Sequence, residues 1–454
     1  MTQTETHYKK QTQTKKRQRE NEPERTERIL KLGSQGGNTR MIANSVMIAL
    51  QIFLAFIGVY QFVLALFGIR RKKNRVQHKP QKSFAVLVAA HNEEKVVGAL
   101  IENLKNLDYP KELYDVFVIC DNCTDGTADI ARSMGVHACE RRNNQLKGKG
   151  YAIEWMLKEL WAMPRQYDAV VMFDADNLVK TDFLTHMNND LVEGHQVIQG
   201  YLDTKNPDDS WVTASYGITY WYCNRLWQLS RKNLGMANFL GGTGMTFDTA
   251  LLKEMGWGAT SLVEDLEFSM RCVQRGVHPV LNYDAKVYDE KPVSFKASAR
   301  QRLRWMQGHF TVARHYFFPL LWASTKERNF VKFDAALYSI SAYTTFLGFV
   351  GTALIWIDNI IPADNIFTSI YAYLPVWAAG AAFLAAALMF PLVMALEGIK
   401  SGKMYAHLVS MIFFQLSWLP ITFYAFFTQN NKQWSHTQHT RVIRLEEVQS
   451  KQAS

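Results

Sequence analysis

The stretch DAVVMFDADN, residues 168–177, is an apolar run of strand length that ends in two aspartates separated by one residue. The same pattern occurs twice earlier, in SFAVLVAAHNEE (83–94) and YDVFVICDNCTD (114–125), and helical-looking segments follow both. Apolar strands that alternate with helices are typical of a parallel sheet covered on both faces. The sequence therefore predicts an α/β domain over residues 83–290.

Polar side chains follow each of these apolar runs: His91, Asp121, Asp125, Asp174 and Asp176. Ligands of an open parallel sheet bind beyond the carboxyl ends of its strands, so we expect these residues to border one site. Two carboxylates at the spacing of Asp174 and Asp176 suit a hard divalent cation, Mg²⁺ or Mn²⁺, whose open positions suit a diphosphate. Aspartates also terminate strands in ordinary turns, and on this stretch alone that alternative stays open.

Two further segments carry charged residues that suit the same chemistry. KGKG (147–150) places Lys149 on a glycine-bearing loop before a helix, which predicts either a diphosphate contact or an exposed basic turn. SLVEDLEF (261–268) places the adjacent acids Glu264 and Asp265 in apolar surroundings. A carboxylate here could remove a proton from an attacking hydroxyl, although the helix dipole alone also favours acids in a first turn.

Other parts of the chain have the composition of a membrane protein. Four uncharged stretches reach the roughly 20 apolar residues that a helix needs to cross a bilayer. They are residues 41–69, 335–357, 366–396 and 404–429. The first is too long and too far from the start to be a signal peptide, so we predict a multi-pass protein of the cell membrane.

The charge distribution sets the expected orientation. The basic run 70–75 follows the first apolar stretch and, by the positive-inside tendency, predicts a cytoplasmic position for the α/β domain behind it. The formal net charge is +10, but no folded nucleic-acid-binding motif accompanies the basic runs, so we expect no nucleic-acid partner. Residues 1–40 are polar, carry both signs of charge and predict a disordered tail.

The five cysteines have no regular spacing, which suits a reducing compartment better than a disulfide framework. Cys120 and Cys123 form a single CxxC pair without a second pair nearby, so two reduced thiols are favoured over a zinc site.

Residues 291–327 mix basic and aromatic side chains and predict helices at the membrane interface. This segment contains QRLRWMQGH, residues 301–309. In a helix, Gln301, Arg304 and Trp305 lie at positions i, i+3 and i+4 and share one face, which we expect to turn toward the site.

Arg302 and Phe310 would then point elsewhere, and we expect them at the lipid headgroups, which attract basic and aromatic side chains. About three membrane helices are predicted over residues 335–429, followed by a C-terminal tail over 430–454. Three crossings would place this tail on the side opposite the α/β domain.

Seven short motifs occur in one order along the chain: HNEE, DNCTD, KGKG, FDADN, GGTG, VEDLE and QRLRW. With this series the chain resembles the membrane-embedded family 2 glycosyltransferases, which include cellulose, chitin, hyaluronan and poly-N-acetylglucosamine synthases. The resemblance implies a glycosyltransferase-A-type domain on the cytoplasmic face, inserted between transmembrane helices and using a nucleotide-activated sugar, usually a UDP-sugar.

The resemblance also implies roles for individual residues. Asp265, with its neighbour Glu264, matches the catalytic base, and Asp176, with Asp174, matches the metal-binding pair. The residues implied in nucleotide-sugar binding are His91, Asn92, Glu93, Asp121, Lys149, Asp174 and Arg304. Those implied in acceptor binding are Gly242, Thr243, Gln301 and Trp305.

Three features of the sequence depart from the family pattern or conflict with the expected topology. Val263 replaces the common threonine of the Thr-Glu-Asp motif, and Asn122 stands where many relatives have a second aspartate. In the basic tail, Trp434, Thr437 and Arg441 resemble a nucleotide-proximal segment of some relatives. A tail on the far side of the membrane contradicts that resemblance, so either the span count is wrong by one or the tail is remote from the site.

The function implied is an inverting transfer that extends a β-linked polysaccharide processively, coupled to its passage across the membrane. The partners implied are a UDP-sugar, a growing glycan or lipid acceptor and membrane lipids, with room for accessory subunits or a homo-oligomer. One alternative is a transferase that adds a single sugar to a lipid, and another is a non-catalytic membrane adaptor.

Overall fold

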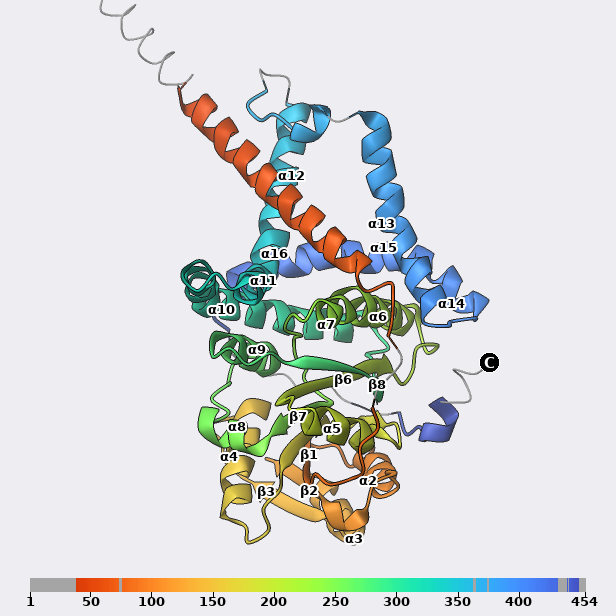
Figure 1. The fold of residues 1–454 in the computed structure, drawn as a ribbon. Helices are drawn as coiled ribbons and strands as arrows, with labels where there is room; N and C mark the ends of the chain where they lie inside the picture. Colours follow the sequence, from red (N-terminus) through yellow and green to blue (C-terminus); the bar gives the residue numbers. More distant parts are fainter. Residues whose placement is uncertain are drawn as a thin grey trace, which may run out of the picture. The chain divides into compact units, whose positions relative to one another are not determined.

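The computed structural model describes residues 38–72, 76–361, 365–373, 375–431, 439 and 441–448, and the chain forms two compact units (Figure 1). The first unit takes its described residues from 1–56 and 347–379, and the second from 57–346 and 380–454. The predicted tail over residues 1–40 lies outside the described residues except for its last three, which begin a helix.

The second unit contains an eight-stranded sheet in the order β3-β2-β1-β4-β7-β6-β8-β5. The strands are β1 (Phe84–Ala90), β2 (Tyr114–Asp121), β3 (His137–Arg141), β4 (Ala169–Asp174), β5 (Leu178–Val179), β6 (Val197–Thr204), β7 (Met245–Asp248) and β8 (Val280–Asp289). β7 runs antiparallel to β4 and β6, β5 runs antiparallel to β8, and the remaining pairs are parallel. The carboxyl ends of β1, β2, β4, β6 and β8 therefore meet at one edge, as an α/β fold requires.

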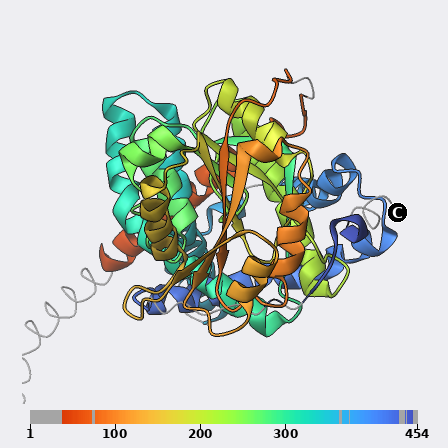
Figure 2. The ribbon, with the colours of Figure 1, turned by 90° about the horizontal axis from the view of Figure 1, so that it is seen from below.

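Both faces of the sheet are covered, which explains why β1 and β4 read as continuous apolar runs. Figure 2 shows strands between helices on either side. The helices around the sheet are α2 (Val97–Lys105), α3 (Thr127–Ser133), α4 (Lys149–Ala162), α5 (Phe183–Val192), α8 (Thr249–Met255) and α9 (Glu264–Gln274). Two short 3-10 helices are η1 (Lys111–Leu113) and η3 (Ile370–Tyr373), the latter in the first unit.

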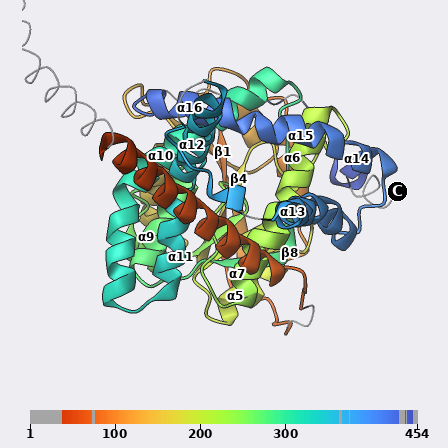
Figure 3. The same cartoon turned by 90° about the horizontal axis from the view of Figure 1, so that it is seen from above.

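A helical layer lies beyond the carboxyl edge of the sheet. It contains α6 (Trp211–Tyr222), the π-helix η2 (Cys223–Leu229), α7 (Ser230–Asn233), α10 (Phe295–Lys326), α11 (Phe330–Ser339), α14 (Gly402–Ala406), α15 (Leu408–Leu416) and α16 (Trp418–Thr428). Ser294 caps α10 through its side chain, which accepts a hydrogen bond from Ala297 N, and the whole QRLRWMQGH segment lies inside this one helix. Figure 3 shows α15 and α16 following one another along this layer.

Two of the described helices are long and apolar enough to cross a membrane: Asn38–Leu66 and the continuous segment Leu408–Thr428. α11 and α12 (Ser341–Ile360) together pass the same test but meet at a bend of 53°, and would make a third span. Within α13 (Val376–Leu396), residues Gly380–Leu396 form a shorter apolar helix.

The prediction that Arg302 and Phe310 face lipid headgroups is wrong, because both are fully buried. Arg302 Nη1 donates to Ser417 Oγ (2.8 Å) at the junction of α15 and α16, and the guanidinium lies over the ring of Phe414. Phe310 packs edge-on against Tyr343, with ring centroids 4.9 Å apart. The helix pair α15–α16 covers the face of α10 that we expected to be exposed to lipid.

Candidate active site

A cavity of about 1240 Å³ in the second unit extends from the carboxyl edge of the sheet to the helical layer. Among the residues predicted from the sequence, it is lined by His91, Glu93, Asp121, Lys149, Asp174, Asp176, Gly242, Thr243, Glu264, Asp265, Gln301, Arg304 and Trp305. Asn92 does not line it; its side-chain oxygen accepts a hydrogen bond from Thr124 N (2.7 Å) and so shapes the loop after β1. Asp125 Oδ1 accepts a hydrogen bond from Thr127 N (3.1 Å), the first residue of the next helix.

The ends of β1 and β2 form one end of the cavity. Asp121 is buried, and its Oδ1 accepts a hydrogen bond from Arg141 Nη1 at 2.5 Å. His91 Nδ1 lies 2.6 Å from the carbonyl oxygen of Asp121, so the two strand ends are joined. Asn122 adopts a positive φ of 53°, which asparagine tolerates better than most residues and which turns the chain sharply after β2.

The end of β4 carries the Asp-x-Asp pair. Asp176 is buried, and its Oδ2 accepts a hydrogen bond from Glu290 N at 2.8 Å. Burial alone would raise the pKa of Asp176, but the nearby cations of His439 and Lys205 outweigh this and lower it. The side chains of Asp174 and Asp176 thus offer anionic oxygens inside the cavity, the ligand type that Mg²⁺ and Mn²⁺ prefer, and they fit such a cation.

The first turn of α9 brings two acids to the middle of the cavity. Burial raises the pKa of Glu264 to about 7, against the opposing charge of Lys149, and burial also raises the pKa of Asp265. Asp265 faces Gly242, where an added Cβ would lie 3.3 Å from Oδ2 of Asp265, and Gly242 has a φ of +87° that favours glycine. Glu264 therefore releases its proton at a higher pH than an ordinary glutamate does.

Lys149 joins the acid pair to the Asp-x-Asp pair. Its Nζ donates to Asp174 Oδ1 at 2.5 Å and to the carbonyl oxygen of Gly242, and lies 3.9 Å from Glu264 Oε1. The carboxylates of Asp174 and Glu264 raise the pKa of Lys149 although burial opposes them, so the ammonium stays charged. Thr243 Oγ1 donates to Asn177 Oδ1 and accepts from Asp174 N, which fixes the turn after β4.

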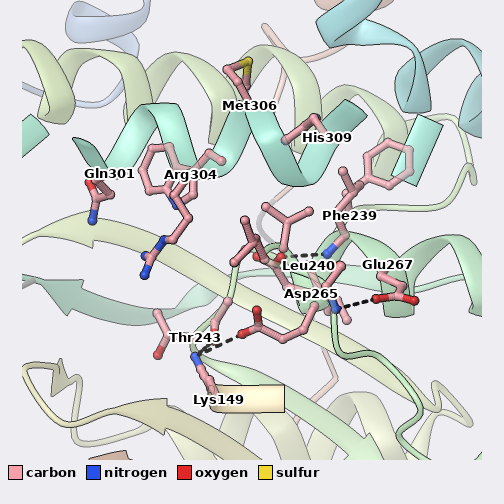
Figure 4. Close-up of a pocket in the computed structure, with 18 of the residues that line it drawn as sticks. Lys149, Phe239, Leu240, Thr243, Asp265, Glu267, Gln301, Arg304, Met306 and His309 are labelled. Atoms are coloured by element: carbon pink, nitrogen blue, oxygen red, sulfur yellow. Dashed lines mark hydrogen bonds and ion pairs between the residues drawn. The ribbon is translucent and has the colours of Figure 1, made fainter. Parts of the chain in front are cut away.

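One face of α10 closes the cavity opposite the acid pair. Figure 4 shows Gln301 and Arg304 projecting from α10 on the side of Thr243 and Lys149. Gln301 Oε1 accepts a hydrogen bond from the Tyr216 hydroxyl (2.9 Å), and burial lowers the pKa of Arg304 against the attraction of Glu264.

Gly308 allows α10 to approach α9 closely. A Cβ added there would lie 2.7 Å from Cγ2 of Val263, the residue before the acid pair, so a helix with a larger residue at this position must move away.

Several charged residues of the cavity were missed by the sequence analysis. Asp289 and Glu290 line it from the end of β8, and Lys205, after the end of β6, donates from Nζ to the carbonyl oxygen of Asp176 (2.8 Å). A signal for them exists, because LDTK at 202–205 and YDEK at 288–291 each cover the end of a strand and share the pattern Asp-x-Lys. Arg141 was missed because only its contact with Asp121 reveals its role.

The described part of the C-terminal tail reaches the same cavity. His439 Nδ1 lies 2.9 Å from Glu93 Oε1, and Arg441 pairs with Asp209. The charges of Asp176 and Glu93 raise the pKa of His439 to about 10 although burial opposes them. Of the two alternatives that the sequence left open, the tail therefore lies at the site; Trp434 and Thr437 lie outside the described residues.

Comparisons with known proteins agree with this architecture. The chain is 22% identical over 398 residues to the "Probable glycosyltransferase YdaM" of Bacillus subtilis, covering 85% of this chain and 91% of that protein. It is 30% identical over 240 residues to the "Beta-monoglucosyldiacylglycerol synthase" of Nostoc sp., covering 50% of this chain and about half (48%) of that protein.

A solved structure, the mannosyltransferase PcManGT from Pyrobaculum calidifontis in complex with GDP-Man and Mn²⁺, shares the fold. Its TM-score is 0.53 at 17% identity, and the match covers 82% of this chain and 99% of that chain. The family model described as "Glycosyltransferase like family 2" matches residues 80–308, which include every strand of the sheet and all seven motifs. The chain belongs to glycosyltransferase family 2.

Proposed function

We propose that the protein transfers a hexosyl unit, with inversion, from a UDP-sugar to a hydroxyl group of an acceptor at the membrane. The observation that carries this proposal is that one cavity contains the Asp-x-Asp pair, Arg304 and the buried acid pair with its raised pKa. These groups suit the two tasks of the reaction, which are to stabilise a departing diphosphate and to accept the proton of a nucleophile.

At the donor end, Asp121 contacts the uridine, with His91 and Glu93 beside it in the wall of the cavity. Asp176, with Asp174, would hold Mg²⁺ or Mn²⁺, which when bound neutralises charge on the diphosphate. The complex of PcManGT with GDP-Man and Mn²⁺ supports a donor of this class and a cation of this kind.

At the reacting centre, Asp265 removes the proton of the acceptor hydroxyl as its oxygen attacks the anomeric carbon. The new carbon–oxygen bond forms opposite the breaking bond, so an α-linked donor gives a β-linkage. The electron pair of the broken bond leaves with the diphosphate, and Arg304 stabilises that charge. The raised pKa of Asp265 suits this step, because it makes the carboxylate a stronger proton acceptor than an ordinary aspartate.

For the acceptor, the first candidate is the growing end of a β-linked polysaccharide. The cavity beyond the acid pair is lined by aromatic rings that can stack on sugars, among them Trp305, Trp227 and Trp418. Trp305 stands edge-on to Tyr216, with centroids 6.2 Å apart, which fixes the orientation of its ring.

The second candidate is a lipid that receives a single sugar. The cavity is also lined by Leu240, Met306, Val312 and Ala342. Burial lowers the pKa of His309, another lining residue, to about 4, so that its imidazole is neutral. Uncharged lining residues of this kind suit an apolar chain as well as they suit a glycan, and the Nostoc relative is named for a glycolipid.

The domain arrangement that accompanies this function is a catalytic domain over 83–290, interfacial helices over 291–327 and membrane helices within 41–69 and 335–429. Because His439 contacts Glu93, the chain must cross the membrane an even number of times between the catalytic domain and the tail. Two crossings within 335–396, with 404–429 lying along α10, satisfy this condition and keep the catalytic domain and the tail in the cytoplasm.

The test is transfer by the full-length protein in lipid nanodiscs, supplied with radiolabelled UDP-sugars, Mg²⁺ or Mn²⁺, and either oligosaccharide or diacylglycerol acceptors. A high-molecular-weight product supports the polysaccharide, and a monoglycosyl lipid supports the second candidate. Asp265→Asn should bind UDP normally and lose transfer by at least a thousandfold. Absence of any transfer by the wild type would contradict the proposal and favour a non-catalytic adaptor. Near-normal turnover of Asp265→Asn would contradict the role of Asp265 as the base.

A further inference from the structure

The ends of β6 and β8 lie side by side and place a second charged group in the cavity, next to the Asp-x-Asp pair. Thr204 and Asp289 are register partners in these parallel strands, and Lys205 N donates to the carbonyl oxygen of Asp289 at 2.9 Å. The next residue, Glu290, donates from its backbone N–H to Asp176. Asp289 is thus held one residue away from the backbone that supports the expected cation site.

Only one of the two carboxylate oxygens of Asp289 accepts a hydrogen bond from the described residues. Its Oδ2 accepts a hydrogen bond from Lys291 Nζ at 2.5 Å, whereas its Oδ1 is buried and accepts no hydrogen bond from the residues that the structure describes. Asp289 lines the cavity, but Lys291, which is only 2% exposed, does not. A buried acceptor without a donor is costly, so this oxygen is suited to a donor that arrives with a ligand.

Two further contacts hold Lys291 in place. Its Nζ lies 3.3 Å from the centre of the Tyr220 ring, and its backbone N donates to Asn206 Oδ1 at 2.8 Å. The ammonium therefore orients Asp289 and cannot turn to meet a phosphate in the cavity without losing both the carboxylate and the ring.

Tyr220, which also lines the cavity, locates this group relative to the reaction. Its ring lies against the Lys291 ammonium that bonds Asp289, so Tyr220 and Asp289 are neighbours in the cavity wall. The space between a diphosphate at Asp176 and the base Asp265 is the space that the transferred sugar must occupy. Asp289 and Tyr220 line the same cavity as Asp176 and Asp265.

We infer that Asp289 is a specificity-determining residue that accepts a hydrogen bond from a hydroxyl of the transferred hexose, with Lys291 as its positioning residue and Tyr220 as the neighbouring wall. The inference rests on the proposed function and adds to it the part of the donor that this group recognises. A sugar hydroxyl is the donor that a buried carboxylate oxygen lacks, and a site built to bond a hydroxyl rejects an analogue that cannot supply it.

The first experiment compares UDP with UDP-hexoses by calorimetry in nanodiscs containing Mn²⁺, for the wild type and Asp289→Asn. The variant should bind UDP within about twofold of the wild type, and its preference for the cognate UDP-hexose over UDP should fall about 10- to 100-fold, the usual effect of a hydrogen bond to a charged group. The kcat/KM ratio between UDP-hexoses that differ only in the configuration of one hydroxyl should narrow by a similar factor. In Lys291→Met, the preference for the UDP-hexose over UDP and the kcat/KM ratio should both fall, but by less than in Asp289→Asn.

Asp284→Asn is the matched control, because it makes the same substitution on the same strand. Asp284 pairs with Arg71 and does not line the cavity, so the preference for the sugar should stay within twofold of the wild type. If Asp289→Asn does not fold, the wild type is tested with deoxy analogues of the cognate UDP-hexose, at least one of which must bind at least tenfold more weakly than the parent.

Three results would overturn the inference: an unchanged preference for the sugar, a change confined to the KM of the acceptor, or a parallel loss of UDP affinity and rise in the Mn²⁺ requirement. The last result would make Asp289 a cation ligand. These outcomes are distinct from failure of the proposed function, in which the wild type itself neither binds UDP nor transfers a sugar.

Discussion

Replacement of Lys149 by methionine tests how the buried acid pair is tuned. The side chain keeps its length and loses the charge that lies 3.9 Å from Glu264. At an effective dielectric constant of about 20, two unit charges at this distance attract by about 4 kcal/mol, equivalent to roughly 3 pKa units as an upper value. Because Lys149 favours the ionised carboxylate, its removal should raise the pKa of Glu264 above its value of about 7.

The assay is the pH dependence of kcat/KM at saturating cation. Its acidic limb reports the coupled pair Glu264 and Asp265 together. In Lys149→Met this limb should move upward by roughly 1 to 3 pH units, so that the rate at pH 7 falls by about fivefold to 500-fold and recovers as the pH is raised. Lys147→Met, an exposed lysine on the same loop, is the charge-matched control and should move the limb by less than about half a unit. An acidic limb that stays in place in Lys149→Met, or moves equally in both variants, would refute this account.

Three other substitutions test the packing around α10. Gly308→Ala pushes a methyl group against Val263 and should destabilise the protein by about 1–3 kcal/mol, seen as a lower thermal midpoint, and slow transfer by displacing the acid pair. Arg302→Leu removes the buried guanidinium that holds Ser417 and should lower the thermal midpoint while UDP affinity is unchanged; an exposed headgroup contact would leave the midpoint as it is. Trp305→Ala should lower kcat/KM for the acceptor about tenfold or more with UDP binding intact, and normal acceptor kinetics would show that its ring only packs.

The sequence predicts the ends of those strands that are buried on both faces. β1, β2 and β4 are continuous apolar runs, so the polar residue that ends each one stands out. β6, with the sequence VIQGYLDT, mixes polar and small residues although every position is buried, because Gln199 bonds to the carbonyl oxygen of Thr243 across the fold. Its end, and the end of β8 beside it, could therefore not be located by hydrophobic pattern alone.

The position of α15–α16 could not be read from the sequence for a related reason. Residues 404–429 are apolar enough to cross a bilayer, and composition does not distinguish a helix covered by lipid from one covered by another helix. The bond from Gln307 to Thr428 and the burial of Arg302 show that part of this apolar surface packs on α10. The contact of His439 with Glu93 likewise joins segments separated by more than 300 residues, which no local pattern encodes.

Residues from the sheet and residues from the helical layer both line the cavity. Asp121, Asp174 and Asp289 line it from the ends of strands of one sheet, whereas Tyr338, Ala342 and Trp418 line it from α11, α12 and α16. A chimera could therefore exchange α11 to α16 with those of a relative and acquire a new acceptor while keeping its sugar nucleotide, and the reverse exchange of the loops after β6 and β8 would alter the sugar alone. Under the proposed function, the residues expected to select the sugar and those expected to select the acceptor therefore lie on different elements of the fold.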